Sequence, residues 1–521
     1  MRRSAFFLVF VSFTLASISE NILISATLIV VGLTFATLGR IGLYALFIIS
    51  IPFVIVIKFP TVLTLSVSDV ILPVVCIVII RNYVRRPDKS LRNLLKKPII
   101  WILLLLGTIL LSAMQENLNL AEYSLSIAKL AFALIGGLAA TGIIFESKDD
   151  SRIKIGLLRT WVLTSFGIAS LGLLGYFALI FGIPTHFMYQ SARLQGTFDN
   201  PNAYAAYGLI SLALALLYNV HQRGRFNSLY TYVIFASIVL SNSRASQIAE
   251  ILFLILGFVL LVRTAADLKS WTFFAVPNLM ILFLFLPLMT IVIALFTPGD
   301  TVAGSAHNSP GPIQPSEVPG GSLPATASPI QPSEVPGGSV PATASPIQPS
   351  EVSGGSLPAT ASPIQPSEVP GGSAPTTTNP IQPRESIGDD SRFHIWSFAL
   401  NLWKSSPLWG RGFGQFISLS KEQLGTGYVV HNSFLSFLTE TGILGGLVFI
   451  SVFIALLVLL IRSKSLTGKI LALAIVVSCV MMLSNNLENS RALWVLMGGS
   501  YAWLRITAIP KVVRAPELTG G

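Results

Sequence analysis

Residues 431–461 read HNSFLSFLTETGILGGLVFISVFIALLVLLI, and this stretch decides the class of protein. The part from 433 to 461 is long and apolar enough to cross a bilayer whose hydrocarbon core is about 30 Å thick. His431 and Asn432 come directly before it, and Glu440 lies one to two turns inside it. A titratable, hydrogen-bonding group therefore stands at the mouth of a membrane helix, where polar residues indicate function.

The rest of the chain has the composition of a membrane protein. Hydrophobic residues make up 52% of the 521, and charged residues make up 11% against roughly 25% in a soluble domain. Apolar runs predict twelve to fourteen membrane spans, since three of the fourteen runs are short. The runs cover about residues 5–19, 22–38, 41–57, 61–80, 98–114, 123–145, 155–183, 202–220, 228–241, 245–263, 271–296, 433–461, 468–485 and 490–508. The predicted fold is an all-α polytopic membrane protein.

Lys and Arg are distributed unevenly over the loops between these runs. Alternate loops are basic, as in the block from Arg81 to Lys97, whereas the opposite short loops carry isolated cations such as Arg193. Because short basic loops stay in the cytoplasm, we expect both termini inside and the segment from about 297 to 432 outside. The same bias explains the net charge of +11, which is therefore no sign of nucleic-acid binding.

The N-terminus and the cysteines add two expectations. The first apolar run follows Met1-Arg2-Arg3 and lacks a small-residue cleavage site, so we expect it to be retained as a span. Cys76 and Cys479 both fall inside predicted spans, and the chain shows neither a disulfide framework nor a metal-ligand spacing. We expect no metal site and no cofactor.

A tandem repeat occupies the long hydrophilic segment. Pro-Ile-Gln-Pro recurs from residue 312 to residue 380 with a period of 17 residues. A solenoid unit needs an apolar face to stack, and these units offer little more than one Ile and one Val, so we expect a disordered, extended insert. The predicted organisation is an N-terminal membrane part, a disordered insert, an ordered outer segment, a C-terminal membrane part and a cytoplasmic tail, at residues 1–296, 297–390, 391–432, 433–508 and 509–521.

The ordered outer segment begins with a predicted helix and continues into a glycine-rich turn. Ile395, Ala399 and Leu402 share one side of this helix, whose aromatic neighbours suit the membrane interface. The turn, Gly410-Arg411-Gly412-Phe413-Gly414, follows no strand and has no Walker lysine, so it does not predict nucleotide binding.

Polar side chains from four segments converge on the outer face in this topology. Arginine presents a fixed fork of donors that matches phosphate oxygens, and histidine exchanges protons near neutral pH, so the group suits transfer from a phosphate-bearing lipid. The candidate residues are Arg193, Asn202, Arg244, Arg392, Arg411, His431, Asn432, Glu440 and Arg491.

Several of these residues have a structural alternative. Arg193 and Arg491 also suit the anchoring of a helix end to lipid headgroups. Asn432 or Ser433 is a natural helix N-cap. Glu440 is either a buried partner or an acid/base group, and Asp69, inside a predicted span, is either functional or a packing residue.

These pieces resemble the bacterial O-antigen ligase and O-antigen polymerase superfamily. The matching residues cover about 190 to 460, and their order and topological placement together are more specific than any one motif. They are Gly196-Thr197-Phe198-Asp199-Asn200-Pro201-Asn202, Ser243-Arg244-Ala245, Arg392, Trp396, Pro407 to Gly414, His431 to Leu435, and Glu440 with Gly442.

The resemblance implies a metal-independent glycosyltransferase of the GT-C type in the bacterial inner membrane. Its donor would be an undecaprenyl-pyrophosphate-linked glycan, its acceptor a glycan or lipid hydroxyl, and its active site would face the periplasm or cell exterior. The resemblance also implies roles for three residues: Arg244 and Arg392 would hold the pyrophosphate, and His431 would activate the acceptor hydroxyl. The resemblance leaves ligation and polymerisation open, and the Pro-rich insert departs from the family pattern.

Two functions from other classes compete with this one. A solute transporter would place ionisable residues and interrupted helices near the bilayer midplane, whereas this chain concentrates its polar residues at the outer ends of spans. A non-catalytic scaffold that displays the repeats would tolerate the loss of Arg244 and His431.

The topology is directly testable. Reporter fusions after Arg92, Arg225 and Lys464 should read as cytoplasmic, and one within residues 312–380 should read as external, because the positive-inside rule fixes the orientation. The measurement is the ratio of alkaline phosphatase to green fluorescent protein activity. A cytoplasmic signal from the repeat fusion would contradict the topology and the outer site together.

Overall fold

The computed structural model describes residues 3–18, 39–54, 57–58, 64–115, 118–181, 183, 185–189, 193–198, 200–222, 227–263 and 389–507. The Pro-rich repeats, the predicted spans of residues 22–38 and 271–296, the C-terminal tail and Asp199 lie outside the described residues.

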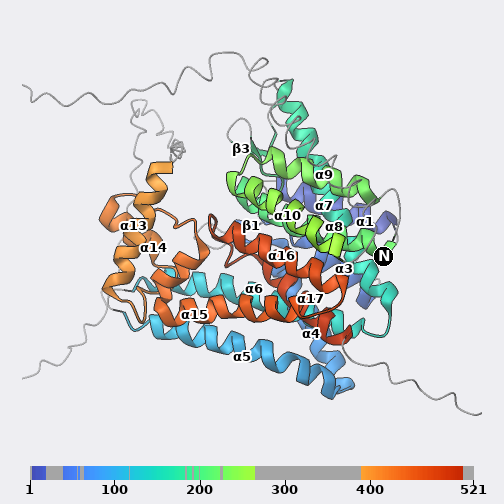
Figure 1. The fold of residues 1–521 in the computed structure, drawn as a ribbon, viewed down its shortest axis with the longest axis horizontal. Coiled ribbons are helices and arrows are strands. Elements are labelled where there is room, and N and C mark those ends of the chain that lie inside the picture. The colour runs from blue at the N-terminus through green and yellow to red at the C-terminus, as the bar shows by residue number, and fades with distance from the viewer. Residues whose placement is uncertain are drawn as a thin grey trace, which may run out of the picture. The chain divides into compact units, whose positions relative to one another are not determined.

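The described part of the chain is almost entirely helical (Figure 1), which confirms the prediction of an all-α polytopic membrane protein. It contains fourteen helices, of which six (α4 to α8 and α15) are long and apolar enough to cross a membrane. The helices are α1 (Arg3–Ile18), α3 (Arg40–Ser50), α4 (Val67–Arg85), α5 (Lys89–Ser112), α6 (Leu120–Glu146), α7 (Ser151–Ile180), α8 (Pro201–Gln222), α9 (Asn227–Leu240), α10 (Arg244–Arg263), α13 (Asp389–Ser405), α14 (Phe416–Leu424), α15 (Ser433–Ile461), α16 (Leu466–Met482) and α17 (Arg491–Thr507).

Two short antiparallel hairpins interrupt the helices. One pairs β1 (Ile57–Lys58) with β2 (Thr64–Leu65), and the other pairs β3 (Met188–Tyr189) with β4 (Arg193–Leu194). The first hairpin lies between the predicted spans of residues 41–57 and 61–80 and touches both, so the first span is helical only to Ser50 and the second only from Val67. Helix α3 has only 11 residues, and Pro52 follows its end, where a proline cannot continue the helical hydrogen bonds.

Polar residues at helix N-termini explain where several spans begin. Ser66 and Asp69 form a capping box before α4: the Ser66 side chain accepts from the Asp69 N–H, and an Asp69 carboxylate oxygen accepts from the Ser66 N–H at 2.9 Å. Such caps satisfy backbone N–H groups that have no partner inside the helix. Side-chain caps also stand before five other helices, at Asp88, Asn119, Asp150, Asn432 and Ser465.

Helices α6 and α17 pack backbone to backbone through two glycines. A Cβ on Gly498 would overlap the carbonyl group of Gly137, and a Cβ on Gly137 would lie 2.8 Å from the Trp494 carbonyl oxygen. The Thr141 hydroxyl lies 3.0 Å from the Gly137 carbonyl oxygen and 3.1 Å from that of Gly498. Small residues and a bridging hydroxyl are how helices associate where lipid removes the hydrophobic driving force.

Helix α15, which lies beside α5 (Figure 1), is broken at Gly442, where the backbone leaves helical geometry (φ 68°, ψ −172°). A glycine-rich turn from the outer segment fills the break. Three backbone hydrogen bonds join them, from the N–H groups of Arg411, Gly412 and Ile443 to the carbonyl oxygens of Thr439 (3.0 Å), Glu440 (3.0 Å) and Pro407 (2.8 Å). The groups that the break removes from the helical ladder are thus paired by another part of the protein.

The two segments approach so closely that glycine is required on both sides. Gly410 has a φ of 75°, and a Cβ there would overlap the backbone of Glu440 and Gly442. A Cβ on Gly442 would overlap the carbonyl group of Leu408. Phe413 adds apolar contact, because its ring lies 5.4 Å from that of Phe437 on α15.

A small separate core holds the outer segment together. Ile395, Ala399 and Leu402 are buried against Phe416 of α14 and Val430, which confirms that the three residues share one side of a helix. Helix α13 also packs on α15, where the Thr439 hydroxyl donates to the Ala399 carbonyl at 3.2 Å. The buried side of α13 therefore faces protein; its position at the membrane interface stays a prediction.

The contact at Gly442 predicts a specific loss of stability. Gly442→Ala forces a side chain into a backbone region (φ 68°, ψ −172°) that is essentially confined to glycine, at a cost of about 1–3 kcal/mol, and also creates an overlap with the Leu408 carbonyl. Gly39→Ala is the matched control, because Gly39 lies in the same backbone region (φ 108°, ψ 172°) but nothing lies within 4 Å of its Cβ position. We expect the thermal unfolding midpoint of the purified protein in detergent to fall several degrees further in Gly442→Ala. Equal shifts in the two variants would contradict the described contact.

Candidate functional site

Arg193 joins three segments that are separated in the sequence. Its Nε donates to the Ser241 carbonyl at 3.1 Å, and its Nη2 donates to Oδ1 of Asn202 at 3.0 Å. Asn202 lies in the first turn of α8, and Ser241 follows α9. The hairpin of β3 and β4, the start of α8 and the turn before α10 are therefore tied together by one guanidinium.

Arg392, on α13 of the outer segment, lies near Arg193. Burial lowers the pKa of Arg193, the nearby Tyr189 raises it, and the positive charge of Arg392 lowers it, so the two guanidinium groups lie within electrostatic reach of each other. Two like charges held near each other disfavour their own charged forms unless an anion accompanies them. Arg193 of β4 and Arg392 of α13 thus bring two positive charges near each other from distant parts of the sequence.

Arg244 stands at the edge of this group as the first residue of α10, three residues after Ser241. Its side chain is exposed. The turn before it is tight: Asn242 has a φ of 47°, and Ser246 donates to the Ser243 carbonyl at 2.8 Å. A helix N-terminus attracts anions, so the backbone there adds to the charge of the side chain.

Trp396 connects the helix that carries Arg392 to the residue before His431. Arg392 and Trp396 lie one helical turn apart on α13, and the Trp396 indole N–H donates to the Val430 carbonyl at 2.9 Å. His431 follows with a φ of 53°. His431 and Asn242 are the non-glycine residues with positive φ in the described part of the chain, and each adjoins a candidate group. Left-handed backbone at such residues is uncommon and clusters at functional sites.

Asn432 and Ser433 fix the backbone below His431. The Asn432 side-chain oxygen accepts from the N–H groups of Phe434 and Leu435 (3.1 and 3.0 Å), so it is the N-cap of α15. The Ser433 hydroxyl donates to the Asn485 carbonyl at 2.8 Å and accepts from the Leu487 N–H at 2.8 Å. The loop between α16 and α17 is therefore attached directly beneath His431.

That loop carries a buried carboxyl group. Glu488 is 6% exposed, and burial raises its pKa above the usual value against the smaller, opposite effects of its own backbone and of the Ser433 and Asn486 side chains. Glu488 is thus linked through Ser433, the first residue of α15, to the helix start that follows His431.

Glu440 and Arg411 lie at the break in α15. A carboxylate oxygen of Glu440 accepts from the Phe416 N–H at 3.3 Å, and the Gly414 N–H also hydrogen-bonds this carboxyl group. Glu440 is 6% exposed, so the arrangement favours the interpretation as a buried partner that holds the glycine-rich turn. The Arg411 backbone is fixed by the same interlock, and its side chain is partly exposed.

Arg491 is engaged with Asp69 across 422 positions of sequence. Its Nε donates to one carboxylate oxygen of Asp69 at 2.6 Å, and its Nη2 donates to the other. Asp69 is only 3% exposed in its side chain, and Arg491 is 19% exposed. This bidentate pair joins the start of α4 to the start of α17, a role that the sequence alternatives for both residues did not include. An acid and an arginine near membrane-span ends are a signal for such pairing.

Metal ligands are a separate question. Within residues that the structure describes, no group of three or more His, Cys, Asp or Glu side chains is arranged to hold a metal ion. The absence of a metal from the reaction stays a prediction based on the resemblance.

The fold and these residues together define an all-α, multi-pass membrane protein with polar groups gathered where several helices begin. Residues 229–450 match the family model described as O-antigen ligase. This match, over somewhat less than half of the chain, confirms the predicted resemblance to the O-antigen ligase and polymerase superfamily. Arg244, Arg392, Arg411, His431, Asn432 and Glu440 lie inside the match, and Arg193, Asn202 and Arg491 lie outside it. No curated protein and no solved structure matches the chain.

The Asp69–Arg491 pair predicts coupled losses of stability. Removing either partner leaves an unpaired, mostly buried charge, so Asp69→Ala and Arg491→Ala should each destabilise the protein by about 3–5 kcal/mol. The double variant should lose less than the sum of the two, because the partners share one interaction. The measurement is a double-mutant cycle from denaturant unfolding in detergent micelles. Additive losses would show that Arg491 acts apart from Asp69.

Proposed function

We propose that this protein transfers a glycan from undecaprenyl pyrophosphate to an acceptor hydroxyl, as an O-antigen ligase or polymerase. The O-antigen ligase domain supports a membrane glycosyltransferase of this type. Two observations support the proposal: Arg392 and Arg193 lie within electrostatic reach of each other, and Trp396, one turn after Arg392 on α13, donates to the carbonyl of Val430, the residue before His431. A pyrophosphate is the anion that such paired cations suit, because its oxygens match the arginine fork.

The arginines have different tasks in this proposal. Arg193 already donates to Ser241 and Asn202, so its charge is held in a fixed position. Arg244 and Arg392 present the charges that contact the pyrophosphate and meet the charge that develops on it as the glycosidic bond breaks. Fixed cations of this kind need no reorganisation during the reaction, which leaves little for a metal ion to contribute.

His431 acts on the acceptor. Its ring nitrogen takes the proton of the acceptor hydroxyl as that oxygen forms a bond to the anomeric carbon. The bond from that carbon to the pyrophosphate oxygen breaks, and undecaprenyl pyrophosphate leaves with the bonding electrons. Asn432 and Ser433 position His431 through the cap and the contacts to the loop at Asn485.

The remaining candidates support this centre. Glu440 holds the glycine-rich turn, and we propose that the partly exposed Arg411 side chain contacts the sugar or phosphate of a substrate. Arg491 contributes through its pair with Asp69. The donor enters from the outer leaflet of the inner membrane, with both termini in the cytoplasm, because the basic loops define that side as internal.

The proposed chemistry predicts separate losses of turnover and binding. His431→Asn should lower the transfer rate about 100- to 10,000-fold while donor binding stays nearly unchanged, since a general base contributes on that order. Asn is chosen because it accepts left-handed backbone such as the φ of 53° at this position. Arg392→Lys and Arg244→Lys should weaken donor binding as well, because the bidentate fork is lost.

The assay is transfer of lipid-linked glycan by the purified protein in the presence of EDTA, with donor binding measured separately. His394→Ala is the matched histidine control, because His394 is exposed on the same helix as Arg392. Arg152→Ala, an exposed arginine on α7, is the arginine control. Wild-type turnover in His431→Asn, or a strict requirement of the reaction for a divalent metal, would contradict this mechanism.

A further inference from the structure

A groove lies between α5, α6, α15 and α17, and the candidate active site uses none of its residues. Its volume is about 340 Å³, within the range of roughly 300–1,000 Å³ that is usual for ligand sites. Its walls are mainly apolar, with Trp101, Leu105, Leu134, Leu456 and Trp494 among the lining residues.

The groove exists because its floor lacks side chains. Gly137 and Gly498 line it, and these are the two glycines through which α6 and α17 pack backbone to backbone. Helices α5 and α15 carry larger side chains, such as Trp101 and Leu456, and these form the walls. The space is thus a product of the tightest helix contact in this part of the fold.

One end of the groove is cationic. Lys97, near the start of α5, and Arg505, near the end of α17, both line it. The Arg505 guanidinium lies 5.7 Å from the centre of the Tyr501 ring, which holds it at the groove. From Lys97 to Leu105 along α5 the groove extends roughly 12 Å at a rise of 1.5 Å per residue. An amphiphile with an anionic head and an apolar chain matches this pattern of charge.

The cationic end lies far from the proposed active site. Helix α15 starts beside His431, and Leu459, near its other end, lines the groove. Beyond the break at Gly442, the part of α15 from Ile443 to Leu459 alone spans roughly 24 Å at a rise of 1.5 Å per residue, which is most of the hydrocarbon core of a bilayer. By the positive-inside rule this end lies at the cytoplasmic leaflet, where anionic lipids attract basic residues.

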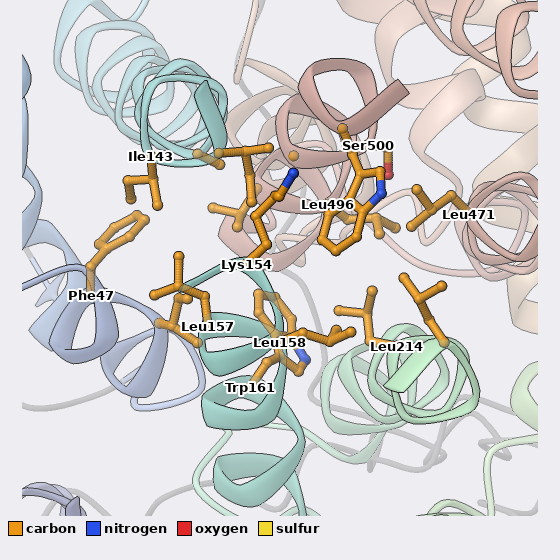
Figure 2. Close-up of a pocket in the computed structure, with 17 residues that line it drawn as sticks. Phe47, Ile143, Lys154, Leu157, Leu158, Trp161, Leu214, Leu471, Leu496 and Ser500 are labelled. Atoms are coloured by element: carbon orange, nitrogen blue, oxygen red, sulfur yellow. The ribbon is translucent and has the colours of Figure 1, made fainter. Parts of the chain in front are cut away.

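A second cavity does not compete for this role. It holds about 90 Å³ on another side of α17, and Figure 2 shows Lys154 among its apolar side chains. The Lys154 amine lies 5.9 Å from the centre of the Trp503 ring, so this cation already has an aromatic partner. The cavity is smaller than usual ligand sites.

We propose that the groove binds an anionic glycerophospholipid of the cytoplasmic leaflet, with its phosphate against Lys97 and Arg505 and one acyl chain along the groove. The lipid is distinct from the glycan donor, because it enters from the opposite leaflet. It also fills the space between α5, α6, α15 and α17 that the glycine contact leaves open.

The test is native mass spectrometry of the full-length protein, titrated with phosphatidylglycerol or with phosphatidylcholine of the same chains. The wild type should bind phosphatidylglycerol more tightly. The double variant Lys97→Gln/Arg505→Gln should lower its affinity about 30-fold and leave the zwitterionic lipid unchanged, since each cation at a membrane surface contributes roughly a factor of five.

Two further variants make the test specific. Arg462→Gln/Lys464→Gln removes the same kinds of charge from exposed positions after α15 that do not line the groove, so it should leave both affinities unchanged. Ala455→Trp fills the groove from its lipid-facing side and should weaken both lipids. If the two double variants lose the same affinity for phosphatidylglycerol, the preference comes from diffuse surface charge, and the proposed site is contradicted. Unchanged binding in Ala455→Trp would overturn the placement of the chain.

Discussion

The break in α15 is the constraint on which the outer part of the molecule depends. A helix interrupted beside lipid leaves backbone groups that water cannot reach, and such groups are tolerated only where protein pairs them. Here the turn at residues 407–412 supplies the pairing, and Gly410 and Gly442 make the approach possible. Because the turn is locked into the helix, α13 and α14 on either side of it have fixed positions relative to the start of α15.

This fixed frame explains how the protein maintains an unfavourable cluster of charge. Arg193 and Arg392 come from distant parts of the chain, and their mutual repulsion must be offset by the contacts around them. The hydrogen bonds from Arg193 to Ser241 and Asn202, and from Trp396 to Val430, provide such contacts. These contacts thus hold Arg193, and the helix that carries Arg392, in fixed positions; in the proposed reaction this is the preorganisation that electrostatic catalysis needs.

Local patterns predicted the helices well, because a membrane span and an amphipathic helix are both properties of contiguous residues. The shared face of Ile395, Ala399 and Leu402 is one example. The pairing of Asp69 with Arg491 had no local signal that named the partner, since 422 positions separate the two residues. Nor did the sequence analysis place a break at Gly442, because the stretch from 433 to 461 is apolar enough on average to be taken as one span, although the polar residues Thr439-Glu440-Thr441 stand directly before the break. The predicted membrane topology indicated that the candidate residues converge on one face. Their hydrogen-bond partners could be identified only from the three-dimensional structure.

The small core under α13 has an evolutionary consequence. The helix that carries Arg392 is anchored by residues that follow it in the chain, through the hydrogen bond from Trp396 to Val430 and the packing on α14. Tandem repeats of 17 residues gain and lose copies readily through replication slippage, and here they stand upstream of that anchor. We therefore expect a change in copy number to leave the packing of α13 unchanged, so that the length of the repeat array and the position of Arg392 can vary independently in evolution.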